Sequence, residues 1–209
     1  MFTKSYITEK MSSYEVGRWG SGVLRQERIQ RGDHNLNPNM ELPKTCKQAA
    51  VLIPLIRHKS GMTVLLTRRA SHLKDHAGQI SFPGGRVETD DVSYEATALR
   101  EAEEEISLSR DRVEVIGRLD NYMTRTGFEI TPVVAFVKPP IFVKPDPCEV
   151  TAIFEVPLSF LMNRINHKRA SKNVNGTTRY FYAMEYREYY IWGATAGMLV
   201  NLSELLSST

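Results

Sequence analysis

The 209-residue chain has few cysteines and no long apolar run. Cys46 and Cys148 are its two cysteines, too few for a disulfide framework, which is typical of a reducing compartment. No segment approaches the roughly 18 uninterrupted apolar residues of a membrane span, and the N-terminal stretch lacks the apolar core of a secretory signal. We therefore expect a cytoplasmic protein that does not bind membranes.

A strong net charge is lacking as well. The chain has 27 Lys and Arg against 24 Asp and Glu, so its formal net charge at pH 7 is +3. Such a mildly basic balance is weak evidence for nucleic-acid binding and suits a polyanionic small molecule equally well. We expect a small-molecule partner and no nucleic acid, while the composition leaves the oligomeric state open.

The length indicates one domain with an N-terminal appendage. We assign residues 1–45 to an N-terminal extension, in which residues 14–30 could form a short helix, and residues 46–209 to the main domain. In that domain, apolar runs of strand length at residues 49–56 and 62–67 flank a turn and predict a hairpin. Further strands are expected at 113–119, 128–137, 149–158, 179–184 and 189–193, and a closing helix at 195–206. This order predicts an α/β fold with a mixed sheet and helices on its faces.

The most informative stretch, residues 84–108, runs from a glycine turn into a helix rich in glutamate. Glu101, Glu104 and Glu105 stand at i, i+3 and i+4, so they project from one side of a helix, where like charges repel. Arg100 can neutralise one of them. The remaining carboxylates form the all-oxygen ligand set that Mg²⁺ or Mn²⁺ prefers. A solvated acidic helix face is the alternative interpretation of such a charge run.

Three neighbouring features favour the metal site over a solvated face. The other side of the helix is apolar at helical spacing, which fixes how the acidic side faces the core (Leu99, Ala102, Ile106). Gly84 and Gly85 let backbone approach a ligand closely. Acceptors for the N-cap of the helix follow the turn (Asp90, Asp91, Ser93). Separately, a run of basic side chains lies upstream, where a phosphate-rich ligand would need them, with solvation of half of them as the alternative (Arg68, Arg69, His72, Lys74, His76).

The stretch resembles the signature of the Nudix hydrolases, G-x5-E-x7-R-E-U-x-E-E-x-G-U, in which U is apolar. Its positions fall on Gly85, the Arg100-Glu101 pair, Ala102, the Glu104-Glu105 pair and Leu108. Two positions depart from it. Asp91 stands where the first glutamate is expected, with eight residues rather than seven between it and Arg100, and Ser107 replaces the last glycine.

A second motif narrows the resemblance. The chain reads LLTRRA from residue 65, HAGQ from residue 76 and FPGG from residue 82, an arrangement similar to the coenzyme A pyrophosphatase branch of the family. This resemblance implies substrate contacts from Arg69, Lys74, His76, Gly84 and Gly85. Lys74 replaces an arginine common in that branch, which keeps the charge and loses the planar fork. Arg69, Lys74 and neighbouring side chains could then receive the 3′-phosphate of the substrate.

The resemblance also implies an architecture and a reaction. We expect the Nudix α/β/α sandwich and metal-dependent cleavage of coenzyme A, or its thioesters, to 4′-phosphopantetheine and adenosine 3′,5′-bisphosphate. Glu101, Glu104, Glu105 and the Gly85 carbonyl would hold Mg²⁺ or Mn²⁺, and Arg100 would orient the helix glutamates. The general base would be Glu149, with Glu155 or a helix carboxylate as the alternative.

Other functions remain open from the sequence. The substrate could be another nucleoside diphosphate compound, such as ADP-ribose, a dinucleotide or a nucleoside triphosphate, because the shared signature does not determine the substrate. A non-catalytic nucleotide-binding or RNA-binding module is the second alternative. The complete R-E-x-x-E-E set argues against this module.

Overall fold

The computed structural model describes residues 2–19, 31–41 and 43–208. Helix α1 (Lys4–Trp19) lies in the predicted N-terminal extension but begins at Lys4 rather than at residue 14. The predicted helix therefore overlaps α1 at residues 14–19, and its remaining residues, 20–30, lie outside the described part of the chain. No helix among the described residues is long and apolar enough to cross a membrane.

In the described part of the chain, nine strands form one mixed sheet. At its centre, β2 (Lys47–His58) pairs in parallel with β8 (Phe128–Val137) and antiparallel with β3 (Gly61–Arg69), which confirms the predicted hairpin. The other strands of this sheet are β1 (Arg31–Gly32), β4 (Ile80–Ser81), β5 (Gly84–Arg86), β6 (Val113–Arg118), β7 (Tyr122–Met123) and β9 (Val150–Pro157). Two pairings position the residues of the candidate site: β5 pairs with β2, and β9 pairs with β3.

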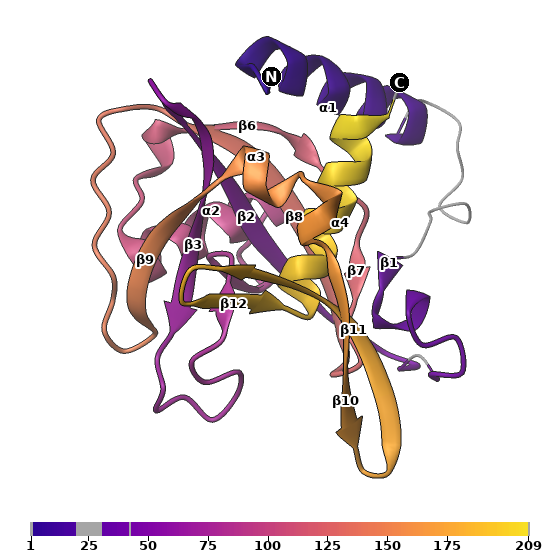
Figure 1. Cartoon of the computed structure of the whole chain (residues 1–209). Coiled ribbons are helices and arrows are strands. Elements are labelled where there is room, and N and C mark those ends of the chain that lie inside the picture. The colour runs from indigo at the N-terminus through magenta and orange to yellow at the C-terminus, as the bar shows by residue number, and fades with distance from the viewer. Residues whose placement is uncertain (1, 20–30, 42, 209) are drawn as a thin grey trace.

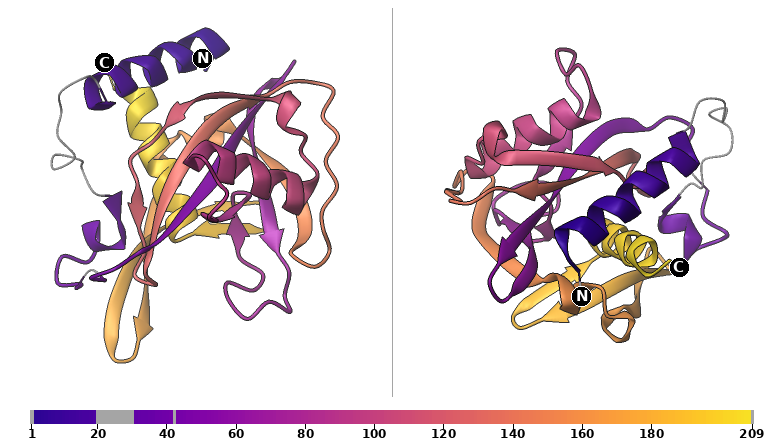
Figure 2. Two further views of the ribbon diagram at one scale, coloured as in Figure 1. Left: turned by 180° about the vertical axis from the view of Figure 1, so that it is seen from behind. Right: turned by 90° about the horizontal axis from the view of Figure 1, so that it is seen from above.

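Helices cover both faces of this sheet, and the predicted α/β/α sandwich is confirmed (Figure 1). Helix α2 (Tyr94–Ile106) lies on one face, in front of the sheet when the molecule is seen from behind (Figure 2). Helix α4 (Ala194–Ser207) lies on the other face with the short α3 (Leu158–Leu161). Successive residues of β2 alternate between the two cores: Leu52 faces α2, and Ile53 faces α4. Because both faces are covered, the strand is an almost continuous apolar run.

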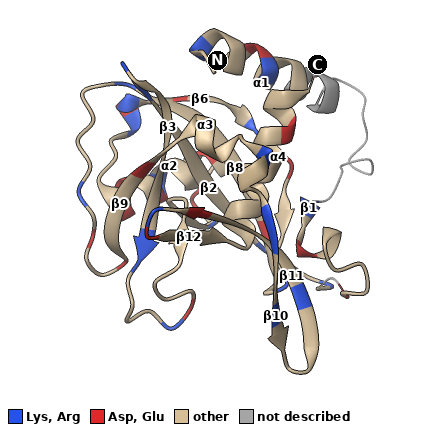
Figure 3. Ribbon diagram, viewed as in Figure 1, with Lys and Arg blue, Asp and Glu red and all other residues tan. Residues whose placement is uncertain are grey.

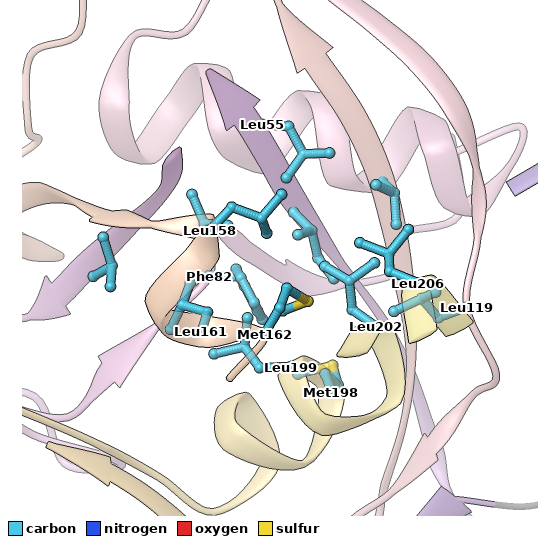
Figure 4. Packing of buried hydrophobic residues seen from close by; sticks show 14 of the residues in the cluster. Leu55, Phe82, Leu119, Leu158, Leu161, Met162, Met198, Leu199, Leu202 and Leu206 are labelled. Carbon is cyan, nitrogen blue, oxygen red and sulfur yellow. The ribbon is translucent and has the colours of Figure 1, made fainter. Parts of the chain in front are cut away.

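The core on the α4 side is the larger of the two. Leu199, Leu202 and Leu206 of α4 pack toward Leu55 and Leu158 (Figure 4). Helix α1 lies across the end of α4 and closes this core with two fully buried side chains (Ile7, Met11). The domain boundary after residue 45 remains a prediction, although α1 shares its core with the main domain.

A second sheet follows the first along the chain. It consists of β10 (Lys168–Val174), β11 (Thr177–Tyr186) and β12 (Tyr189–Trp192), and the β10–β11 hairpin projects from the body of the molecule (Figure 1). Asn175 and Gly176 both have positive φ in its turn, as the Asn-Gly sequence predicts. Single-turn helices at Asp33–Asn35, Arg110–Arg112 and Arg164–Asn166 complete the elements.

Candidate metal and phosphate site

Helix α2 positions the acidic residues. The Ser93 hydroxyl accepts a hydrogen bond from the Ala96 amide at 3.2 Å and caps the first turn, and the helix ends at Ser107 in the left-handed conformation. Ala102 and Ile106 are fully buried against the sheet. This packing turns the side of α2 that carries Glu101 and Glu105 toward strand β5.

Glu105 is the most buried carboxylate of the helix, with only 2% of its surface exposed. It accepts a hydrogen bond from the Gly84 amide at 3.3 Å and forms an ion pair with Arg69 at 3.5 Å. Burial raises the pKa of Glu105 to about 8, and the charges of Glu149 and Glu101 add to the shift while Arg69 opposes it. Glu105 is therefore an acidic group whose negative charge its surroundings compensate only in part.

Glu101 lies against the glycine turn. A Cβ atom on Gly85 would stand 2.4 Å from the Glu101 carboxylate carbon, so a side chain at residue 85 would displace that carboxylate. A Cβ atom on Gly84 would likewise lie 2.5 Å from the Ala50 carbonyl oxygen. Burial raises the pKa of Glu101, Arg100 opposes the shift, and Glu149 adds to it. Both glycines thus let the strand backbone and the carboxylates meet.

Arg100 connects the carboxylates to the loop before the helix. Its guanidinium donates to both oxygens of Asp91, at 3.1 and 3.0 Å, and to Glu101 and Glu104 at 2.9 Å each. It also donates to the carbonyl oxygen of Arg86 at 3.0 Å, which ties α2 to strand β5. Such a fork of charge-assisted hydrogen bonds fixes the orientation of the neighbouring groups. Arg100 thus contacts Glu101, and its expected role in orienting the helix glutamates stays a prediction.

Asp91 is the partner of Arg100 whose role the extra residue in the signature left in doubt. Its carboxylate accepts from Arg100, from the Thr97 hydroxyl at 2.9 Å and from the Glu88 amide at 2.9 Å. The Arg100 guanidinium holds the pKa of Asp91 well below its usual range. The signal was present in the sequence, because Asp91 occupies the acidic position of the signature in spite of the extra residue.

Glu149, and not Glu155, lies at the carboxylate cluster. Glu149 directly precedes β9, its carbonyl accepts from the Ala70 amide at 2.7 Å, and its charge raises the pKa of both Glu101 and Glu105. Glu155 lies six residues further along β9, about 20 Å away in an extended strand. There it hydrogen bonds to His58 at 2.6 Å.

The loop that carries Glu149 is attached to the end of α2. The Lys144 amide donates to the Ile106 carbonyl and the Asp146 amide to the Glu105 carbonyl, both at 2.9 Å. These carbonyls belong to the last turn of the helix, where no helical donor reaches them. The loop thus satisfies the helix end and holds Glu149 beside the helix carboxylates.

Three residues of the expected site lie apart from this cluster. Glu104 points to solvent, with 56% of its side chain exposed and Arg100 as its partner. Lys74 and His76 are exposed on the loop between β3 and β4, where the His76 ring bonds to Gln79 at 3.0 Å. Among the described residues, neither Lys74 nor His76 has a hydrogen bond or ion pair to the carboxylates. The structure thus brings together Arg69, Gly84, Gly85 and three glutamates (Glu101, Glu105, Glu149).

The chemistry of the cluster fits a hard divalent cation. Its donors are carboxylate oxygens, and burial and mutual repulsion raise the pKa of Glu101 and Glu105, so the charge is not fully balanced. Within the described ranges, no three histidine, cysteine, aspartate or glutamate side chains are gathered tightly enough to hold an ion. The reason is visible in the contacts: Arg100 engages Glu101, while Arg69 and the Gly84 amide engage Glu105. Glu101 and Glu105 are the candidate ligands that lie in this cluster, and Glu149 borders them.

Comparison with known proteins gives the family of the chain. The family model described as NUDIX domain matches residues 47–174. An uncharacterized Nudix hydrolase, NudL, of Enterobacter sp. (strain 638) is 41% identical over 157 residues, which cover 75% of this chain and 81% of the relative. NudL of Shigella flexneri serotype 5b (strain 8401) is 40% identical over 161 residues, covering 77% and 83%. The chain belongs to the Nudix hydrolase family, whose members act on pyrophosphate bonds in nucleoside diphosphate compounds.

Among solved structures, the fold is similar to a binary complex of the Ap4A hydrolase of C. elegans. The TM-score is 0.46 at 17% sequence identity, and the similarity covers 53% of this chain and 80% of that chain.

Proposed function

We propose that the protein is a metal-dependent pyrophosphohydrolase that cleaves coenzyme A or its thioesters to 4′-phosphopantetheine and adenosine 3′,5′-bisphosphate. The observation that carries the hydrolytic part is that Glu101 and Glu105 lie against the Gly84-Gly85 turn, with the charge of Glu149 near enough to raise the pKa of both. The choice of substrate rests on the resemblance of residues 65–85 to the coenzyme A pyrophosphatase branch. Family membership alone does not determine the substrate.

Each residue has a part in this proposal. Glu101 and Glu105 would hold Mg²⁺ or Mn²⁺, with Glu104 and the Gly85 carbonyl as further candidate ligands. The bound ion would neutralise the diphosphate oxygens and lower the pKa of a bound water. Arg100 keeps Glu101 in place through its hydrogen bonds to Asp91 and Arg86.

The candidate for the general base is Glu149. It lies on a loop fixed to the end of α2 and next to the helix carboxylates, whereas Glu155 is occupied by His58 far along β9. A base has to reach the water from which it removes a proton, and of these two residues only Glu149 borders the cluster. The helix carboxylates remain the alternative.

The experiment is to incubate the purified protein with coenzyme A, ADP-ribose and a nucleoside triphosphate, each with Mg²⁺, with Mn²⁺ and with a chelator. Products are identified by mass. We expect metal-dependent release of 4′-phosphopantetheine that Glu105→Gln abolishes. Turnover of ADP-ribose or the triphosphate alone would support the proposed metal-dependent hydrolysis but refute coenzyme A as the substrate. No turnover of any compound would favour the binding module, which tight RNA binding at physiological salt would then support.

A further inference from the structure

Strand β3 ends in two arginines, Arg68 and Arg69, whose side chains lie on opposite sides of the sheet. Arg69 reaches the α2 side, where it forms an ion pair with Glu105 at 3.5 Å. The guanidinium of Arg68 lies over the Tyr189 ring of β12, 5.1 Å from its centroid, and Tyr189 packs against the core on the α4 side. Successive strand residues point to opposite faces, so this separation follows from the strand itself. The basic end of β3 is visible in Figure 3.

The guanidinium of Arg68 lies over a ring that is itself packed against another ring. Tyr189 stacks on Phe154, with ring centroids 3.5 Å apart and planes 2° from parallel, so the ring beneath Arg68 is itself fixed. In the part of the chain that the structure describes, Arg68 forms no ion pair with a carboxylate, whereas Arg69 is paired with Glu105. A guanidinium whose face is stacked keeps its N–H donors in the plane of the group, where they can bind a planar or tetrahedral oxyanion.

The surroundings of Arg68 favour an anion. The loop at residues 70–79 starts after Arg69 and rejoins the sheet at Ile80, which pairs with Arg68. This exposed loop carries three basic side chains (His72, Lys74, His76) and one acidic side chain (Asp75). Arg68 therefore lies at the base of a basic loop, half-buried and preoriented.

The two arginines extend from adjacent positions at the end of β3, one on each side of the sheet. Their Cα atoms are about 3.8 Å apart, as for any consecutive residues, so their guanidinium groups diverge from one point of the chain. If a nucleotide with its 5′-diphosphate at the carboxylates beside Arg69 runs past the end of β3, its ribose lies between the two arginines. A phosphate on that ribose is then the group within reach of Arg68.

We propose that Arg68 determines specificity by binding a second phosphate group of the substrate, a monoester on the ribose of a nucleoside diphosphate. This inference rests on the proposed function and assigns the ribose phosphate to Arg68 rather than to Arg69, because Glu105 already engages Arg69. Tyr189 is a positioning residue, since it holds the guanidinium by its ring face.

The test compares coenzyme A with 3′-dephospho-coenzyme A, which differ only in the ribose phosphate. Arg68→Gln should lower kcat/KM for coenzyme A by about 30-fold, the loss of one or two charge-assisted hydrogen bonds. It should change kcat/KM for the dephospho compound less than about twofold, because the two ligands share every other contact. The matched control is Arg169→Gln, which removes another arginine that lies over a ring, 4.4 Å from the Tyr180 centroid on the projecting hairpin. It should leave kcat/KM for both substrates unchanged.

Equal losses with both substrates, or no loss with either, would overturn the proposal. Tyr189→Phe should retain the preference for the phosphorylated compound and Tyr189→Ala should reduce it, which separates the ring from the hydroxyl. If wild type cleaves neither compound, the proposed function is wrong and calorimetry decides the role of Arg68. Arg68→Gln should then weaken binding of adenosine 3′,5′-bisphosphate about 30-fold while leaving adenosine 5′-monophosphate unaffected, and equal binding of the bisphosphate to both proteins would refute it.

Discussion

Replacing Asp91 with asparagine should destabilise the protein by about 2 kcal/mol, the middle of the range for a hydrogen-bonded charged group. The substitution keeps the shape of the side chain and removes the charge that Arg100 contacts at 3.0 and 3.1 Å. Both side chains are mostly buried, at 7% and 16% exposure, so water replaces the lost interaction only in part. For a chain of this length, the loss corresponds to a decrease in Tm of about 4–8 °C.

The same change should weaken the candidate metal site. Arg100 orients Glu101, and Asp91 is the group that holds the other edge of the Arg100 guanidinium. Loss of a residue that orients metal ligands commonly costs about 10–100-fold in metal affinity. Electron paramagnetic resonance of Mn²⁺ titrated into the protein measures this affinity independently of any substrate.

The pH dependence has a defined sign. The pKa of Asp91 is lowered in the folded protein, so its stabilisation is present above its unfolded pKa of about 3.9 and is lost only as the pH falls through the folded value. The difference in free energy of unfolding between wild type and Asp91→Asn should therefore be constant from about pH 5 to about pH 8. Urea denaturation at several pH values in this range measures it.

A matched control tests whether charge alone explains the effect. Asp90→Asn removes the same formal charge one residue earlier, at an exposed position in the turn. It should change the free energy of unfolding by less than about 0.5 kcal/mol, as surface substitutions do. Equal destabilisation by both substitutions, or a difference between wild type and Asp91→Asn that shrinks from pH 8 to pH 5, would refute the reasoning.

Three further predictions concern the helix end, the glycine turn and the base. Ser107→Gly should stabilise the protein by about 0.5–1 kcal/mol in urea denaturation, because Ser107 has φ 55°; a lower urea midpoint would contradict this. Gly85→Ala should abolish Mn²⁺ binding with a retained circular dichroism spectrum, since its Cβ would lie 2.4 Å from the Glu101 carboxylate carbon, and unchanged affinity would exclude this close approach. Glu149→Gln should lower kcat for the hydrolysed substrate by about 10²–10⁴-fold, and Glu155→Gln should leave it unchanged. The reverse order would make Glu155 the base.

Much of the fold follows from local pattern. The apolar runs at residues 49–56 and 62–67 became the central hairpin because a strand buried on both faces needs apolar residues at every position. Helix α2 followed from Ala102 and Ile106, whose spacing places them on one buried side. Helix α1 begins at Lys4 rather than at the expected residue 14. Ile7 and Met11, which are buried and four residues apart, show the same helical spacing of apolar side chains.

The arrangement of the carboxylates was predicted less well, for a geometrical reason. Successive helix residues are about 100° apart, so Glu104 and Glu105 leave the helix in different directions. Spacing alone grouped Glu101, Glu104 and Glu105, whereas the packing of α2 selects Glu101 and Glu105 and leaves Glu104 at the surface. Which of two neighbouring glutamates enters a site depends on the rotation of the helix about its axis, and tertiary packing sets that rotation.

The extra residue before Arg100 shows what the spacing of a signature represents. A strict count would move the acidic residue away from the arginine, yet Asp91 contacts Arg100 with both oxygens. The turn absorbs the insertion, since the Asp91 amide donates to the Glu88 carbonyl and the Glu88 amide donates to the Asp91 side chain. The loop thus folds back on itself and presents a carboxylate to the first turns of α2. What such a site requires is an acid that reaches the guanidinium, and a loop can meet this requirement at more than one length.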